Sequence, residues 1–563
     1  MPPRHPVFDV ADRYVERLAA IAPIEATFAG IDGYDDRWGD LSVQGLEAHA
    51  ELVTSVRSEL DQLPPGQHED DQLAVRALAD HLDPKIEEHE HGDPLRDLAH
   101  LGSTIPSIPE ILNLHDPTTD EGRAALIGRL STLPAALADW RRRMQVAVER
   151  DVLVASRQVE SVVGQLRDAV APGGGITAAM DRLTAAAPEL TDVVDRWRSA
   201  SGDAAEATAR WLEQTYLPRA PERDAVGPER YQRALHGLLG TDLDLEETSA
   251  WAWEELRVLL ERATTVAASI DDTSGLRAVL DLLRHDPRYA VEDPHRFRDL
   301  MQERQTAALE QLEGTHFDVP GTIRQVDVRL APPGGALGAY YIGPSEDLSR
   351  PGSIWWSLGD AERIPLFEEI TTAYHEGFPG HHLQVGLQVT FGDRLTRAHR
   401  LLIWNPGYGE GWALYAETLM DELGELEQPA YELGYLTSSI LRLLRVVIDI
   451  GLHLEHDLPR DLDLPGGSTL EAGSPWTFDR AVAALTDIAA LADDYAVSEV
   501  TRYLGWPGQA ISYAVGQREI LRLREARRQR DGRRFDLRTF HADVLGSGPV
   551  GLDHLGERVR GTP

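Results

Sequence analysis

Apolar residues recur at three- and four-residue spacing through most of this chain, and this period predicts a mainly α-helical fold. The spacing is clearest in six segments bounded by Pro or Gly, namely 8–22, 43–63, 121–150, 178–214, 229–270 and 292–313. The spacing returns over 477–530, after a stretch at 459–475 that is rich in Pro, Gly and Asp and predicts a surface loop.

One region departs from this pattern and predicts a small antiparallel β-sheet. Short β-branched and aromatic runs, separated by Gly and Pro, lie at 317–320, 323–330, 338–342 and 352–356. A predicted helix over 365–382 follows directly. We therefore expect one compact unit with two lobes, a helical N-terminal lobe at 1–316 and a second lobe at 317–563 that contains the sheet.

The composition excludes several kinds of function. The 563 residues include no cysteine, which excludes disulfides, thiolate nucleophiles and Cys-type zinc sites. Lys85 is the only lysine and lies outside any Gly-rich run, so a P-loop and Schiff-base chemistry are not expected. No G-x-S-x-G nucleophile elbow is present either. Metal or carboxylate chemistry is the main catalytic option that remains.

The net charge and the hydropathy of the chain argue against several kinds of partner and location. The formal net charge of −38 repels nucleic acid and anionic lipid, so neither is an expected partner. No segment has 18 uninterrupted apolar residues, and 1–23 lacks the apolar core of a secretory signal. The sequence predicts a cytoplasmic protein with no membrane partner.

One segment carries a pattern close to a zinc-protease signature, His375-Glu376-Gly377-Phe378-Pro379-Gly380-His381-His382. In H-E-x-x-H, two histidines one helical turn apart bind Zn²⁺ and the Glu acts as general base. Here Pro379 stands four residues after His375, where it would clash with the carbonyl of His375. A two-residue bulge at Pro379-Gly380 would bring His381 to the position of the second ligand, with His382 as the alternative.

A catalytic zinc site also needs a third protein ligand and one open position. Glu410 stands 29 residues after His381, at the predicted start of another amphipathic helix. Taken alone, a Glu in a first helical turn is explained by the helix dipole. Together with His375 and His381, Glu410 is the candidate third ligand.

Two further segments offer polar side chains to such a site. Arg445, Asp449 and His453 recur at four-residue spacing in a helix predicted over 436–456 that is otherwise apolar. They form either a structural ladder or a group that supports the site, with His453 presented to the substrate. Tyr513 follows a turn and is either a core tyrosine or a donor to an oxyanion.

Two other charged clusters are interpreted as solvated surface. The segment 87–91, which reads Glu-Glu-His-Glu-His, is predicted to be a loop, and the eight arginines between 518 and 534 are predicted to line a solvated helix face.

The sequence contains three motifs, His375–His382, Glu410–Tyr415 and Pro507–Tyr513. These motifs and their order resemble the bacterial "domain of unknown function 885" family. The resemblance covers most of the chain and extends to Arg445–His453, Glu499–Tyr503 and Phe535–His541. It implies a zincin-like fold of the gluzincin kind, in which the third zinc ligand is Glu, with a helical cradle and a small sheet. It implies no particular substrate.

These observations predict a zinc-dependent hydrolase, a metallopeptidase that acts on short peptides. His375, His381 and Glu410 would hold Zn²⁺ and Glu376 would take a proton from the water that the metal activates. Tyr513 or His453 would stabilise the oxyanion. Two alternatives are a non-catalytic zincin-like protein that binds a peptide or metabolite, and a metal-dependent amidase with a non-peptide small-molecule substrate.

Overall fold

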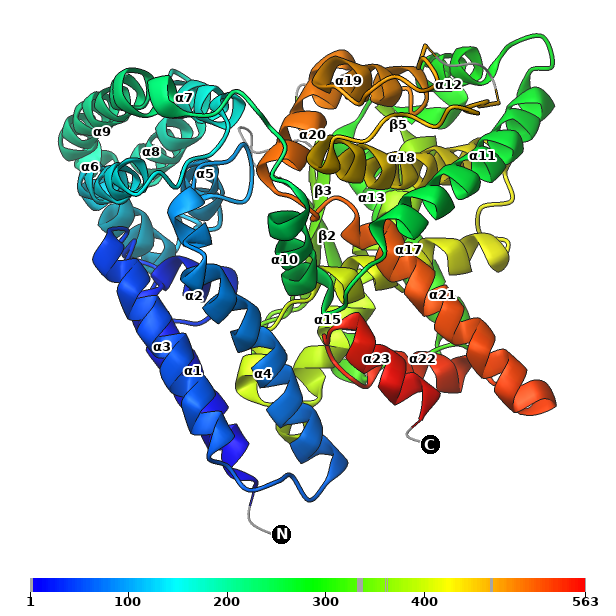
Figure 1. Cartoon of the computed structure of the whole chain (residues 1–563), viewed down its shortest axis with the longest axis horizontal. Helices are drawn as coiled ribbons and strands as arrows, with labels where there is room; N and C mark the ends of the chain where they lie inside the picture. Colours follow the sequence, from blue (N-terminus) through cyan, green and yellow to red (C-terminus); the bar gives the residue numbers. More distant parts are fainter. Residues whose placement is uncertain (1–3, 332–337, 360, 362, 466–468, 562–563) are drawn as a thin grey trace. The chain divides into compact units, whose positions relative to one another are not determined.

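The computed structural model describes residues 4–331, 338–359, 361, 363–465 and 469–561. Helices make up most of these residues, which confirms the predicted mainly α fold (Figure 1). No helix in the described ranges is long and apolar enough to cross a membrane.

The described chain divides into two compact units. The first comprises 4–224 and Thr396–Leu402, and the second comprises the remaining described residues from Ala225 onward. The division thus falls at Asp224 rather than at 316. The helices between 225 and 316 belong to the second unit because one of them, α11 (Leu245–Ile270), packs along α18 (Pro429–Leu454).

The first unit is built from ten α-helices within the described residues. They are α1 (Pro6–Ile21), α2 (Pro23–Phe28), α3 (Val43–Asp61), α4 (Glu69–Glu90), α5 (Thr104–Asn113), α6 (Asp120–Glu149), α7 (Ser156–Val170), α8 (Gly175–Ala186), α9 (Thr191–Trp211) and α16 (Arg397–Leu401). Two apolar clusters form its core, one around Trp140 and Met144 and the other around Phe8 and Tyr14. Residues 87–90 lie in the last turn of α4, so the loop predicted there is wrong.

The second unit contains the other helices and all the described strands. Besides α11 and α18, its helices are α10 (Pro228–Leu239), α12 (Leu276–His285), α13 (Pro294–Leu312), α14 (Leu366–Glu376), α15 (His381–Thr390), α17 (Pro406–Glu422), α19 (Phe478–Asp487), α20 (Asp493–Gly505), α21 (Ser512–Asp531), α22 (Leu537–Leu545) and α23 (Leu552–Arg560). Its strands are β1 (Ala290–Val291), β2 (Val326–Leu330), β3 (Gly338–Ile342), β4 (Gly352–Ser357) and β5 (Ile364–Pro365).

A three-stranded sheet lies beside the helices that carry the histidines. Its central strand is β4, which pairs antiparallel with β3 (Gly338 opposite Ser357) and parallel with β2 (Val326 opposite Gly352). The predicted sheet is therefore present, but one of its two pairings is parallel. Strand β3 packs against α14 and β4 against α15, so the sheet supports both helices.

Residues 317–320 do not form the predicted strand. Phe317 makes only an isolated bridge with Glu313, and a 3₁₀ turn follows at Gly321–Ile323. Pro320 explains the difference, because it has no N–H to donate to a neighbouring strand.

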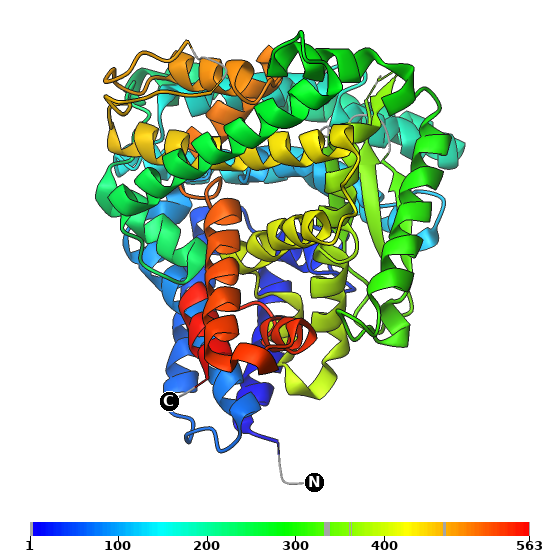
Figure 2. The same ribbon diagram turned by 90° about the vertical axis from the view of Figure 1, so that its right-hand side faces the viewer.

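Helices α17 and α21 cross at close range next to the candidate site (Figure 2). A Cβ atom at Gly516 on α21 would lie 1.9 Å from the carbonyl oxygen of Gly407 on α17, a distance that no side chain tolerates. Glycine at this position lets the two backbones touch. The crossing brings the first turns of α21 against the segment of α17 that carries Glu410.

Candidate metal centre

Helix α14 ends at Glu376 and α15 begins at His381, so the predicted single helix over 365–382 is two helices. Four residues, Gly377–Gly380, connect them, in place of a bulge inside one helix. Pro379 favours a break at this point because it has no N–H and its ring would clash with the carbonyl one turn back. The break redirects the chain so that the first residue of α15 returns toward the last turn of α14.

Hydrogen bonds from two other helices fix this connection. Gln305 of α13 accepts from the Phe378 N–H at 2.6 Å and donates to the Ala373 carbonyl at 2.7 Å. Trp412 of α17 donates its indole N–H to the Pro379 carbonyl at 2.9 Å. Backbone groups that the broken helix leaves free are thus satisfied, which holds the connection in one conformation.

Glu410 is positioned by the start of α17. Asn405 caps this helix by accepting the Tyr408 N–H at 2.9 Å, and Pro406 occupies the first turn. Because the helix begins at Pro406, Glu410 lies in its second turn and not at its N-terminal end as predicted. The helix dipole therefore does not account for a Glu at position 410, since its effect fades beyond the first turn.

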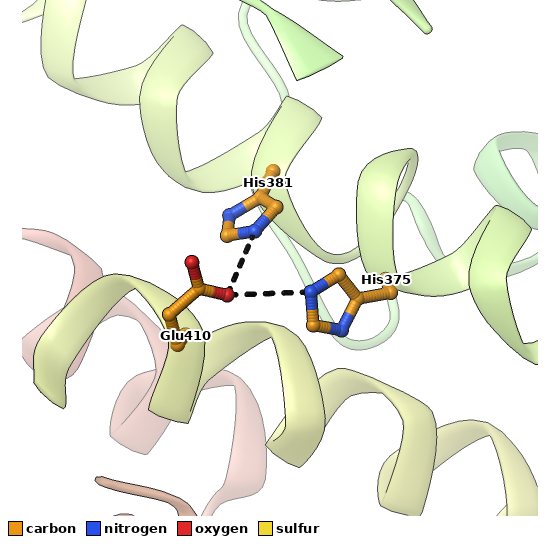
Figure 3. A group of neighbouring side chains, drawn as sticks. All are labelled: His375, His381 and Glu410. Atoms are coloured by element: carbon orange, nitrogen blue, oxygen red, sulfur yellow. Dashed lines mark ion pairs between the residues drawn. The ribbon is translucent and has the colours of Figure 1, made fainter. Parts of the chain in front are cut away.

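His375, His381 and Glu410 converge on one point (Figure 3). Glu410 Oε2 lies 3.4 Å from Nε2 of His375 and 3.4 Å from Nε2 of His381, and the three ligand atoms all lie within 4.8 Å of one another. Two ligand atoms that are each about 2.0 Å from a tetrahedral zinc ion lie about 3.3 Å apart. The spacing therefore fits a zinc ion held by these three side chains.

The hydrogen-bonding state of Glu410 supports the same interpretation. Its Oε2 atom is buried, and no described residue forms a well-aligned hydrogen bond with it, although two imidazole nitrogens face it. Burial acts to raise the pKa of Glu410, but His375 and His381 outweigh it and hold the pKa below its usual range. A buried, ionised oxygen without a hydrogen bond is costly unless a cation satisfies it.

Glu417 orients His375 from one side. Its Oε1 lies 2.8 Å from His375 Nδ1, and its other oxygen accepts a hydrogen bond from the hydroxyl of Thr371. A carboxylate on the far nitrogen of a histidine sets its tautomer and directs the other nitrogen to a metal. Sequence analysis missed this role, although Glu417 stands two helical turns after Glu410 on the same face of α17.

The electrostatics of His375 depend on both carboxylates. Burial acts to lower its pKa, but Glu410 and Glu417 outweigh burial and raise the pKa to about 10 in the protein without an ion. A metal ion and a proton therefore compete for Nε2 of His375, because a metal ligand must be deprotonated.

Glu376 lies beside the three candidate ligands and remains available for proton transfer. Burial raises its pKa, Glu410 raises it further, and His375 and His381 act to lower it. No described residue donates a hydrogen bond to its carboxylate.

Tyr513 lies next to the same group. Its ring is nearly parallel to that of His375, with the ring centroids 6.3 Å apart. Burial raises the pKa of Tyr513, and the charge of Glu410 raises it further, so the phenol stays protonated and can donate. The close crossing of α17 and α21 produces this placement.

His382 faces away from the group. Its Nδ1 lies 3.0 Å from the Tyr341 hydroxyl of β3, and its Nε2 donates to the Ile323 carbonyl at 2.9 Å. Both ring nitrogens are thus used to fasten α15 to the sheet region. Of the two histidines considered as second ligand, the structure brings His381 to the site.

His453 lies apart from the group formed by His375, His381 and Glu410. Its Nε2 donates to the Tyr503 carbonyl at 3.0 Å and its Nδ1 accepts the Val226 N–H at 3.4 Å. The side chain is fully buried, with both nitrogens facing backbone groups. These contacts favour the structural alternative for His453 over a role at the substrate.

The polar residues of α18 follow the structural alternative in part, since His453 Nε2 lies 3.7 Å from Asp449 Oδ1, and they also contact neighbouring helices. Arg445 donates to Glu499 of α20, while Asp449 accepts from the Tyr231 hydroxyl of α10 at 2.7 Å and from the Gly508 N–H at 2.9 Å. The three polar residues of α18 therefore hold α10 and α20 in place behind the site.

The arginines near the C-terminus form the predicted solvated face only in part. Arg522, Arg528 and Arg530 are exposed, whereas the side chain of Arg524 is only 12% exposed. Several pair with carboxylates on or near α21, as Arg522 does with Glu519 and Arg524 with Glu422. They do not gather into an anion site.

The site lies one side chain below the surface. Trp404 is 44% exposed, and its ring centroid lies 5.8 Å from that of His381. The side chain of Glu410 also retains 14% exposure.

Two solved structures resemble this chain along its length. A "putative lipoprotein" from Colwellia psychrerythraea superposes with a TM-score of 0.82 at 22% identity, covering 98% of each chain. A protein of unknown function from Shewanella oneidensis with the same description gives a TM-score of 0.67 at 16% identity, again over 98% of each chain. At these identities the likeness shows a shared fold.

The family assignment comes from the sequence. Comparison with proteins of curated function gives no match. Residues 23–559 match the family described as "Bacterial protein of unknown function (DUF885)". Since the match spans nearly the whole chain, this protein belongs to the DUF885 family.

Proposed function

We propose that this protein is a zinc-dependent hydrolase that acts on short peptides. The observation that supports this most strongly is the buried Glu410 Oε2 without an aligned hydrogen bond, 3.4 Å from Nε2 of both His375 and His381. Two imidazoles and one carboxylate are the ligand set of zinc peptidases with a Glu third ligand. His375, His381 and Glu410 would hold the ion.

The neighbouring side chains can carry out the proton transfers of amide hydrolysis. Zn²⁺, when bound in such a site, polarises a carbonyl and lowers the pKa of a water toward ~7. Glu376 takes the proton from the attacking water and passes it to the leaving amine. Tyr513 donates a hydrogen bond to the oxyanion, and Glu417 keeps His375 in the required orientation.

The state of Glu376 favours a hydrolase over a binding protein. A site that only binds a peptide or metabolite needs no base beside the metal ligands. Here the Glu376 carboxylate directly follows the candidate ligand His375 and has no hydrogen-bond partner among the described residues. A Glu next to the first histidine ligand is the position of the general base in zinc peptidases.

The test separates metal binding from chemistry. Purified protein supplied with zinc should hold about one ion per chain, and His375→Ala, His381→Ala and Glu410→Ala should each lose it. Glu376→Gln should keep the ion and lose hydrolysis of short peptides by roughly two to four orders of magnitude. Elemental analysis and a peptide-hydrolysis assay provide the two measurements.

His382→Ala is the matched control for the histidines. It removes an adjacent imidazole that is bonded to Tyr341 and Ile323, so zinc content should stay at the wild-type level. Loss of zinc in His382→Ala with retention in His381→Ala would reverse the ligand assignment. Full peptide hydrolysis by Glu376→Gln would remove the proposed base.

A cytoplasmic location, expected from the sequence, stays part of this proposal. Fractionation of the native host with an antibody checks it, and recovery of the protein in the envelope fraction would contradict it.

A further inference from the structure

Two arginines of α18 lie over the ring of Tyr513. The Cζ atoms of Arg442 and Arg445 are 5.6 Å and 5.1 Å from its centroid. They differ in their other contacts. Arg445 donates two hydrogen bonds to Glu499, at 3.0 and 2.7 Å, so its charge is balanced within the fold.

Arg442 has no such partner. It is partly buried, its Nε is buried without a hydrogen bond, and no described residue forms an ion pair with it. The chain has 93 acidic and 55 basic residues, yet no carboxylate of the described residues pairs with Arg442. A partly desolvated guanidinium that has an aromatic ring but no carboxylate beside it costs free energy that an anionic ligand can recover.

Arg442 lies close to the proposed oxyanion donor. Its guanidinium is over the ring of Tyr513, and the centroid of that ring lies 6.3 Å from that of the candidate ligand His375. Within the described residues, Arg442 donates no hydrogen bond to Tyr513 or to Glu376. Its guanidinium can therefore bind a group of the substrate while Glu376 remains available for proton transfer.

We propose that Arg442 binds a carboxylate of the substrate. The inference rests on the proposed hydrolase function and names its substrate class, peptides with a carboxylate near the cleaved bond. The planar guanidinium of arginine matches a carboxylate with two parallel hydrogen bonds. In a chain with a net charge of −38, a local cation is also needed to offset the repulsion of an anionic substrate.

Two sources can supply this carboxylate, the free C-terminus of a peptide and an acidic side chain. Binding to the metal-free protein distinguishes them without requiring catalysis. The probes are acetyl-trialanine as free acid, the same peptide as C-terminal amide, and an amide in which the last alanine is replaced by glutamate. Isothermal calorimetry measures each affinity for wild-type protein and for Arg442→Gln.

We expect at least one carboxylate-bearing peptide to bind wild type roughly 10- to 100-fold more tightly than the neutral amide, the loss typical of one charged hydrogen bond. The preference should disappear in Arg442→Gln and persist in part in Arg442→Lys. Preference for the free acid assigns the C-terminus, and preference for the glutamate amide assigns a side chain. Equal affinities in wild type, or a preference that survives in Arg442→Gln, would overturn the proposal.

Arg277→Gln is the matched control for net charge. Arg277 is exposed on α12 and pairs with Asp487, so its loss changes the charge equally and should leave the carboxylate preference intact. If Arg442→Gln does not fold, as judged by circular dichroism, Arg442→Lys alone decides through a measurable drop in that preference.

Measurements of peptide hydrolysis distinguish a failure of the Arg442 proposal from a failure of the proposed hydrolase function. With zinc-loaded protein, kcat/KM for the preferred peptide should fall roughly 10- to 100-fold in Arg442→Gln, while the neutral amide changes little. If the preference depends on Arg442 but zinc-loaded wild type hydrolyses no peptide, the hydrolase proposal fails and the carboxylate site stands.

Discussion

The Tyr513 hydroxyl is the donor that we expect beside the reacting carbonyl, because its ring lies 6.3 Å from that of His375. Tyr513→Phe removes this hydroxyl and keeps the ring against Arg445. Turnover of short peptides should fall roughly 10- to 1000-fold, the effect of one oxyanion donor, with zinc content unchanged. Steady-state kinetics on the zinc-loaded variant measure the turnover. If Tyr513→Phe turns over peptides at the wild-type rate, Tyr513 does not stabilise the oxyanion, and the metal alone does so.

The buried carboxyl group of Asp449 should make the free energy of unfolding depend on pH. It is fully buried, one of its oxygens has no hydrogen bond, and burial raises its pKa from an ordinary value of 3.8 to about 7. A raised carboxyl pKa favours the fold below about pH 4, and this contribution is lost as the pH rises toward 7. Over that window the loss amounts to at most about 4 kcal/mol.

Asp449→Asn removes this titration while it keeps an oxygen for Tyr231 and Gly508. We expect the free energy of unfolding of wild type, relative to the variant, to fall between pH 4.5 and pH 7.5. Urea unfolding of both proteins at several pH values provides the measurement. Parallel stability curves would show that Asp449 is ionised in the folded protein over the whole range.

At the scale of elements, the crossing of α17 and α21 decides whether Glu410 and Tyr513 meet. A methyl group at Gly516 would lie 1.9 Å from the Gly407 carbonyl, so Gly516→Ala must push the two helices apart. We expect a loss of roughly 1–3 kcal/mol in the free energy of unfolding, together with lower turnover.

Gly202→Ala is the control for this substitution. Gly202 lies within α9 with no atom within 4 Å of the added methyl group, so alanine should be neutral or stabilise by roughly 0.5–1 kcal/mol. Chemical denaturation compares the two variants. If both variants change the free energy of unfolding equally, the close approach of α17 and α21 is not the reason for glycine at position 516.

At the scale of the whole molecule, metal binding should stabilise the unit that carries the site. A ligand that binds only the folded state adds about 2.7 kcal/mol when its concentration is 100 times its Kd. Because His375, His381 and Glu410 all belong to the second unit, zinc should slow hydrogen exchange in α14, α15 and α17 and leave α1–α9 unchanged.

Hydrogen exchange followed by mass spectrometry, with and without zinc, checks this expectation. His381→Ala should show no response to zinc. Equal protection of α1–α9 would indicate that the two units unfold together.

The helical class, the sheet region and the candidate ligands His375 and Glu410 follow from the sequence, because they depend on local periodicity and on side-chain chemistry, while the sequence leaves the second histidine open between His381 and His382. It also identified Pro379 as the point where a regular helix cannot continue. Tertiary structure decided the remainder. His381 rather than His382 reaches Glu410 because Gln305 and Trp412, distant in sequence, fix the connection between α14 and α15. The burial of His453 and the unpaired state of Arg442 likewise depend on which helices pack against α18, and no local pattern encodes that choice.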